Sequence, residues 1–209
     1  MRELLIGVVS LLLSVPAFAQ ATASKPAAAT APKPAAAAAQ PSAPPAKKSA
    51  GAGPVIVIET AKGRIEIETY PTEAPKTVQH ILALVKKNFY NAQRVHRVVK
   101  GFVVQFGDPQ TRDMTKKASW GTGGSGTTIG AAEFNPLRTH NLGAVAMAHA
   151  GDAKAADSQM YITLAPTHRL DGGYAVFGQV ISGMDVVQTL AVDDVIKRIT
   201  VRPETAASN

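Results

Sequence analysis

Apolar and polar residues alternate along the first part of the chain that has a strong pattern. Residues 55–59 and 64–68 are rich in β-branched side chains, and in the second segment apolar residues alternate with acidic ones. A period of two is typical of a strand with one buried face. The short segment 60–63 between them ends in glycine, so the pattern predicts a β-hairpin.

A helical pattern follows, and it begins at Pro75, a residue that suits the first turn of a helix. Lys86 and Lys87 stand in the expected last turn, where cations suit the helix dipole. The apolar positions recur at the i, i+3, i+4 and i+7 spacing of one helix face, and they are Val78, Ile81, Leu82 and Val85. One apolar stripe predicts one packed face.

The remaining apolar runs are short. We expect a second short helix at residues 184–190. Further strands are expected at residues 95–99, 102–106, 144–147, 160–164, 175–180 and 195–201. Many short strands with two helices, and without an alternating strand and helix pattern, suggest a mainly β fold that closes into an antiparallel barrel.

The amino-terminal segment has the pattern of a secretory signal. Residues 4–15 are apolar, and Pro16 and Ala17-Phe18-Ala19 supply a small-x-small cleavage site. The stretch from Leu4 to Ala19 is shorter than the ~20 residues that span a bilayer as a helix. We therefore predict a signal peptide at residues 1–19, with an uncleaved anchor as the alternative, and export to the periplasm.

Residues 20–53 consist mostly of Ala, Pro, Lys and Ser. Such a segment buries too little apolar surface to offset chain entropy, so we predict a disordered linker. It is either a neutral spacer or a tether that holds the domain away from a membrane or wall. The folded domain is expected at residues 54–202, followed by a tail at 203–209.

Composition excludes several classes of protein. The net charge of +7 falls to +3 for residues 54–209 once the linker lysines are set aside, which gives no case for nucleic-acid binding. The chain has no cysteine, so disulfides, thiolate metal sites and thiol nucleophiles are absent. The histidines have no paired ligand spacing, and we expect neither a metal nor another cofactor.

The candidate chemistry lies in residues 95–108, two apolar runs hinged at Lys100-Gly101. If residues 102–106 form a strand, Val103 and Gln105 share one face, and by the same parity Arg97 belongs with them. Phe102 has the opposite parity. It is directed to the core unless the bend at Gly101 rotates it toward the groove.

A glycine-rich stretch, residues 121–128, lies in the polar segment that follows. Gly121 and Gly126 have the spacing of a phosphate-binding loop, but Thr127 stands where that loop needs a lysine. A loop whose glycines adopt positive φ angles is the better interpretation.

Residues 95–108 resemble the signature of the cyclophilin-type peptidyl-prolyl isomerases, Phe-His-Arg-x-x-x-Gly-Phe-x-x-Gln-Gly-Gly-Asp, except at Val95 and Phe106. The resemblance extends over about residues 54–202. Other family motifs recur in order: Gly121-Thr122-Gly123-Gly124, Ala146-Met147-Ala148, Asp157-Ser158-Gln159, Leu170-Asp171-Gly172 and Val176-Phe177-Gly178. The resemblance implies a closed eight-stranded antiparallel barrel with an α-helix capping each end.

The resemblance also implies a peptidyl-prolyl cis-trans isomerase without a cofactor. Arg97 would face the prolyl nitrogen, and Phe102 and Gln105 complete the expected catalytic set. The expected substrate-binding residues are Val103, Ala148, His149, Ala150, Gln159, Tyr161, Leu170 and Tyr174. We expect a monomer that acts on proline-containing unfolded or folding polypeptides.

Four positions depart from the family pattern. Val103 replaces a common methionine, Tyr161 a usual phenylalanine, Arg169 a frequent aromatic residue and His149 an asparagine. Val103 widens the pocket and Tyr161 adds a hydroxyl that needs a partner. Two hypotheses follow: an isomerase that serves folding exported proteins, or a module that binds proline segments as a holdase chaperone with little turnover.

Overall fold

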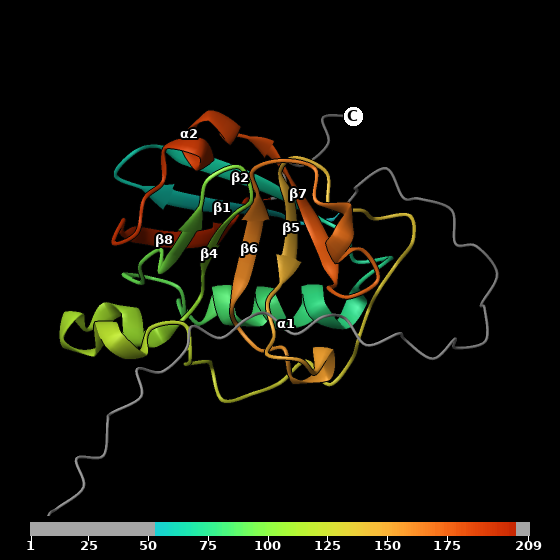
Figure 1. Ribbon diagram of the computed structural model, residues 1–209, viewed down its shortest axis with the longest axis horizontal. Coiled ribbons are helices and arrows are strands. Elements are labelled where there is room, and N and C mark those ends of the chain that lie inside the picture. The colour runs from blue at the N-terminus through green and yellow to red at the C-terminus, as the bar shows by residue number, and fades with distance from the viewer. Residues whose placement is uncertain (1–52, 204–209) are drawn as a thin grey trace, which may run out of the picture. The chain divides into compact units, whose positions relative to one another are not determined.

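The structure is a computed structural model that describes residues 53–203. The predicted signal peptide, all but the last residue of the predicted linker, and residues 204–209 of the predicted tail lie outside the described residues. The described chain forms one antiparallel sheet with the strand order β3-β4-β6-β5-β7-β2-β1-β8 (Figure 1). The strands are β1 (Val55–Thr60), β2 (Arg64–Thr69), β3 (Arg97–Val99), β4 (Val103–Phe106), β5 (Ala144–Met147), β6 (Met160–Thr163), β7 (Val176–Ser182) and β8 (Ile196–Val201).

The sheet curls into an open half-barrel, so the predicted closed barrel is wrong. Strands β3 and β8 are its two ends, and within residues 53–203 no ladder joins them. The chain just before β3 approaches β8 through an isolated bridge between Arg94 and Val195 and through neighbouring backbone hydrogen bonds. Positive φ angles at Ala92 (61°) and Asp193 (78°) interrupt the extended backbone on both sides of this contact. Strand β3 begins at residue 97, not at the predicted residue 95.

The two predicted helices are present at opposite ends of the sheet, α1 (Pro75–Lys86) and α2 (Met184–Thr189) (Figure 1). Helix α1 buries the predicted stripe, with Leu82 only partly covered. The sequence pattern did not predict the four 3-10 helices η1 (Pro109–Arg112), η2 (Met114–Ser119), η3 (Ala153–Ala155) and η4 (His168–Leu170). No helix within residues 53–203 is long and apolar enough to cross a membrane.

The main hydrophobic core lies between the sheet and the two helices. Along β4, Val104 and Phe106 belong to this core, whereas Val103 belongs to a second, separate apolar cluster. The same alternation occurs along β5 and β6, where Val145 and Ile162 face the main core. Because side chains on a strand alternate between two faces, the second cluster lies on the opposite face of the sheet.

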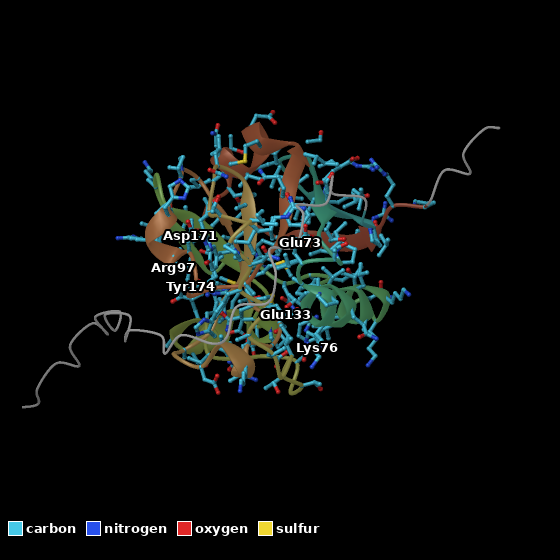
Figure 2. All side chains as sticks on the ribbon, turned by 90° about the vertical axis from the view of Figure 1, so that its right-hand side faces the viewer. Glu73, Lys76, Arg97, Glu133, Asp171 and Tyr174 are labelled. Carbon is cyan, nitrogen blue, oxygen red and sulfur yellow. The ribbon has the colours of Figure 1, made fainter. Side chains whose placement is uncertain are left out.

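Helix α1 is capped by a residue from a distant segment. The N-cap residue, Ala74, has no side chain that accepts a hydrogen bond. Instead, the two carboxylate oxygens of Glu133 accept hydrogen bonds from the backbone N–H groups of Lys76 (3.0 Å) and Thr77 (2.8 Å). Figure 2 shows Glu133 and Lys76 beside this helix. A negative charge at a helix N-terminus also interacts favourably with the helix dipole.

We expect the Glu133→Ala variant to lose about 1 kcal/mol of unfolding free energy, the usual cost of removing an N-cap acceptor. Glu133→Gln is the matched control, because its amide oxygen still accepts one bond while the charge is gone, and it should lose less. Urea unfolding followed by circular dichroism measures both. An alanine variant as stable as the parent protein would show that this cap contributes nothing.

Candidate active site

The second apolar cluster, called the groove cluster below, brings together six of the residues that the sequence predicted for the site. They are Phe102, Val103, Ala148, Tyr161, Leu170 and Tyr174. The other members are Tyr70, Ala144, Ala146 and Val176. These residues come from β4, β5, β6 and β7, from η4 and from turns and loops beside the strands, so the cluster exists only in the folded chain.

Strand periodicity places the pocket residues. Val103 and Gln105 lie on the face of β4 that is opposite to the main core, as predicted, and Tyr161 pairs with Gln105 across the β4 and β6 ladder. On β5 the same face carries only Ala144 and Ala146, and both of these small side chains are fully buried within the cluster.

Phe102 reaches the groove cluster because it is not part of a strand. Strand β4 begins at Val103, and Phe102 lies in the turn before it, next to Gly101 with a φ angle of 68°. The parity of the strand therefore does not govern its direction. Of the two directions considered for this side chain, rotation toward the groove is confirmed.

A chain of side-chain amides leads to Arg97. Arg97 pairs with Gln105 across β3 and β4, and its Nη1 donates to Gln105 Oε1 at 3.3 Å. Gln105 Nε2 donates to Gln159 Oε1 at 3.0 Å. Gln159 Nε2 in turn donates to the backbone carbonyls of Gly121 (2.9 Å) and Gly123 (2.8 Å). These two carbonyls fix the orientation of both amides, so Gln105 presents its oxygen to Arg97.

The glycine loop, residues 121–126, is held by the buried carboxylate of Asp108. Asp108 Oδ2 accepts hydrogen bonds from the N–H groups of Gly121 (2.6 Å) and Gly123 (3.0 Å), and Oδ1 accepts one from Gln110 N–H (2.8 Å). A Cβ atom on Gly123 would lie 2.4 Å from Asp108 Oδ1, which explains the glycine. The predicted positive φ angles are confirmed at Gly121 (91°) and Gly126 (84°).

The guanidinium of Arg97 lies at the exposed edge of the groove cluster. Its Cζ is 5.8 Å from the centroid of the Phe102 ring. Arginine carries five N–H donors and stays protonated at ordinary pH, and the bond to Gln105 occupies one of them. Donors therefore remain for a substrate in the groove. In Figure 2 the Arg97, Tyr174 and Asp171 labels lie on the same side of the domain.

The hydroxyl of Tyr161 has a buried partner that the sequence analysis did not identify. Tyr161 Oη lies 2.9 Å from His140 Nε2, and His140 Nδ1 lies 2.7 Å from Asp171 Oδ1. The Asp171 carboxylate accepts a hydrogen bond from Nδ1–H of His140, which leaves Nε2 unprotonated to accept a hydrogen bond from the Tyr161 hydroxyl. The only signal in the sequence was that a buried tyrosine hydroxyl needs a partner.

Burial and hydrogen bonds together set the charge states of these three residues. Burial raises the pKa of Tyr161 strongly, which keeps its hydroxyl protonated. Burial also lowers the pKa of His140 and outweighs the opposite effect of its hydrogen bond to Asp171. Burial alone would raise the pKa of Asp171, but hydrogen bonds from His140 and His168 outweigh it and lower that pKa.

The remaining predicted residues form the other rim of the groove cluster. The His149 ring stacks on Tyr174, with ring centroids 4.4 Å apart, and His149 Nε2 lies 2.9 Å from the carbonyl oxygen of Gly173. Ala148 N–H donates to the carbonyl of Gln159 at 2.9 Å. Ala150 is exposed in the bend that follows. Within residues 53–203 no group of three or more potential metal ligands comes together.

Comparison with known proteins identifies the family. Residues 55–206 match the profile described as "Cyclophilin type peptidyl-prolyl cis-trans isomerase/CLD". Peptidyl-prolyl cis-trans isomerase B of Bacillus subtilis is 40% identical over 139 residues, which are 66% of this chain and 90% of that protein. Peptidylprolyl isomerase domain and WD repeat-containing protein 1 of Mus musculus is 36% identical over 154 residues, which are 71% of this chain but 21% of that longer protein.

A solved structure has the same fold. The crystal structure of a cyclophilin-type peptidyl-prolyl cis-trans isomerase from Cryptosporidium parvum superposes with a TM-score of 0.63 at 25% identity, covering 73% of this chain and 99% of that one. The profile match spans nearly all the described residues, including the groove cluster and the amide chain. The chain therefore belongs to the cyclophilin-type peptidyl-prolyl cis-trans isomerase family.

Proposed function

We propose that this cyclophilin-type peptidyl-prolyl isomerase accelerates rotation of X-Pro bonds by a hydrogen bond from Arg97 to the prolyl nitrogen. The observation that supports this most strongly is the position of Arg97: its guanidinium is hydrogen-bonded to Gln105 and lies beside the apolar groove cluster. In this proposal the groove cluster takes the proline ring. No covalent step and no cofactor is needed.

The chemistry requires selective stabilisation of a twisted amide. Resonance gives an X-Pro bond its rotation barrier of ~18 to 20 kcal/mol, and uncatalysed turnover takes ~10 to 100 s. When the bond twists, the lone pair localises on the prolyl nitrogen, which then accepts a hydrogen bond that the planar ground state accepts poorly. A charge-assisted hydrogen bond contributes about 1.5 to 3 kcal/mol, or ~10- to 100-fold in rate.

The rest of the acceleration comes from positioning. In this proposal the proline ring packs against Phe102, Val103 and Leu170 of the groove cluster, and an immobile ring lets the acyl side rotate alone. At the other end of β4, the Gln105 and Gln159 amides and the backbone at Ala148 offer hydrogen bonds to the substrate chain before the proline. His149, Ala150 and Tyr174 border that end.

The alternative is a module that binds proline segments as a holdase chaperone with little turnover. Val103 and Tyr161 affect the fit of the ring, so affinity for proline is the property they change. The hydrogen bonds of Gln105 and Gln159 hold the guanidinium of Arg97 in position beside the groove cluster. A protein that only binds proline segments has no need of such a positioned donor. The arrangement of Arg97 therefore favours catalysis.

We also propose that the chain is exported and acts as a monomer on proteins that fold in the periplasm, without binding nucleic acid. The support is the sequence pattern alone: an apolar run, a small-x-small site at Ala17-Phe18-Ala19 and a linker that resembles a tether. The charge of residues 54–209 is too small to suggest a nucleic-acid surface.

The first test is the cis-to-trans rate of a short Ala-Pro peptide with the purified protein. Arg97→Ala should lower the acceleration by at least about tenfold, because the donor is lost. Arg97→Lys keeps the charge but lacks the planar fork, and should recover only part of the rate. Arg198→Ala, which removes an exposed arginine paired with Glu59, is the matched control and should act like the parent protein.

Two outcomes would contradict this mechanism. A folded Arg97→Ala variant with full acceleration would remove Arg97 from catalysis. A parent protein that binds the peptide, as measured by nuclear magnetic resonance titration, but does not accelerate its isomerisation would support the binding module.

The Tyr161-His140-Asp171 triad predicts a pH dependence of stability. The pKa of His140 in the folded protein is below its ordinary value of 6.5, so below that pH the unfolded chain takes up a proton that the folded chain resists. The unfolding free energy should fall as the pH drops from about 7.5 to about 5, and His140→Gln should make this slope shallower. His168→Gln is the comparison variant: His168 is exposed and also bonds to Asp171, so its loss should change the slope less than the loss of the buried His140. Equal slopes in all three proteins would contradict a buried neutral His140.

Export predicts a defined product. When the full chain is expressed in a Gram-negative host, mass spectrometry of the periplasmic fraction should find a mature protein that begins at Gln20. A double variant, Ala17→Leu with Ala19→Leu, removes the small residues that the peptidase reads and should accumulate uncleaved. Full-length protein confined to the cytoplasm would overturn the proposal.

A further inference from the structure

The groove has two chemically different ends, separated by the length of β4. At one end, Gln105 and Gln159 form the amide chain beside the glycine loop. At the other end Phe102 precedes the strand, three residues from Gln105. A strand advances by about 3.3 Å per residue, so these ends lie roughly 10 Å apart with the pocket between them. A bound peptide that fills the pocket passes from one end to the other.

Arg169 dominates the Phe102 end. It lies in η4, its side chain is exposed, and its Cζ is 4.6 Å from the centroid of the Phe102 ring, closer than that of Arg97. Arg169 and Phe102 border an open hollow of about 370 Å³. Its other lining residues are Gly101, Pro166, Thr167 and His168, and no acidic residue lines it.

The charge of Arg169 is not neutralised by the described chain. Within residues 53–203, Arg169 takes part in no ion pair, and neither does Lys100, which precedes Gly101 in the same turn. The carboxylate that follows η4, Asp171, is occupied: Oδ1 accepts from His140 N–H and lies near its Nδ1, and Oδ2 pairs with His168. The aromatic face of Phe102 holds the guanidinium at the groove edge without taking up its donors.

We infer that Arg169 selects substrates with a carboxylate side chain on the residue that follows the proline. The inference rests on the proposed function, in which the amide end holds the chain before the proline. The chain after the proline then leaves the pocket over Phe102, where Arg169 offers a planar fork that suits a carboxylate. Arg169 is a specificity-determining residue in this account, and Arg97 remains the group that contacts the reacting bond.

The test uses matched peptides that differ at one position. The full-length protein is given Ala-Ala-Pro-Glu and Ala-Ala-Pro-Gln peptides with blocked ends, and kcat/KM and affinity are measured for both by exchange spectroscopy and titration. The glutamate peptide should be preferred by roughly two- to fivefold, the size expected for an exposed charge pair. Raising the salt concentration from about 20 mM to about 0.5 M should shrink this ratio, because salt screens exposed charges.

Variants separate charge from packing. Arg169→Gln should remove most of the preference for glutamate and leave only the small contribution of Arg97 and Lys100, and Arg169→Lys, which keeps the charge, should retain a preference for glutamate. Lys100→Gln is a control for the general positive field and should reduce the ratio less than Arg169→Gln. Because each ratio compares two peptides on one protein, differences in folding or overall activity cancel.

The outcomes separate this inference from the proposed function. Equal rates for the two peptides, with clear acceleration of both, would overturn the role of Arg169 and leave the isomerase intact. If neither peptide is accelerated, the proposed catalysis fails. The role of Arg169 is then decided by the binding affinities: tighter binding of the glutamate peptide supports it, and equal affinities overturn it. A second pair of peptides, Ala-Glu-Pro-Ala and Ala-Gln-Pro-Ala, tests the assigned direction: a preference for glutamate in this pair alone would overturn it.

Discussion

The period of two along a strand is the constraint on which this structure depends, because the central strands serve two apolar faces at once. On β4, Val104 and Phe106 pack in the main core while Val103 and Gln105 build the site. A shift of the register by one residue would exchange these two sets and destroy both. The sheet that holds the fold together therefore also positions the site residues, because they stand on strands whose other face is packed in the main core.

Polar side chains near the groove cluster form a continuous series of hydrogen bonds, and this series orients the guanidinium of Arg97. The buried Asp108 carboxylate holds the glycine loop, the loop carbonyls orient Gln159, and Gln159 orients Gln105. A side-chain amide can be placed either way round, so without these carbonyls Gln105 would have no preferred orientation toward Arg97. Preorganised donors are effective in catalysis because no reorganisation is needed when charge develops.

The sequence predicted what local periodicity and glycine chemistry control, and missed what depends on contacts between distant segments. The strands, the stripe on α1 and the shared face of Val103 and Gln105 follow from spacing. Whether the sheet closes depends on two short turns around Ala92 and Asp193, which carry no strong signal. His140 lies 21 residues from Tyr161 and bonds to it only in the folded chain, so no local pattern could identify it.

The guanidinium groups of Arg97 and Arg169 both lie near the ring of Phe102. They are held in different ways, and this difference suits one to catalysis and the other to substrate selection. Arg97 is bonded to Gln105, which limits its direction and suits a donor that must meet one atom of a twisted bond. Arg169 has no such hydrogen bond within residues 53–203 and is held only by the aromatic face, so it can follow a mobile side chain. Because both groups are cations, neither neutralises the other, and a carboxylate beside Phe102 would be attracted by both. The positive charge of Arg97, which stabilises the twisted bond, therefore also favours acidic substrates. Arg169 is closer to Phe102, so it determines that the preferred carboxylate lies on the residue after the proline.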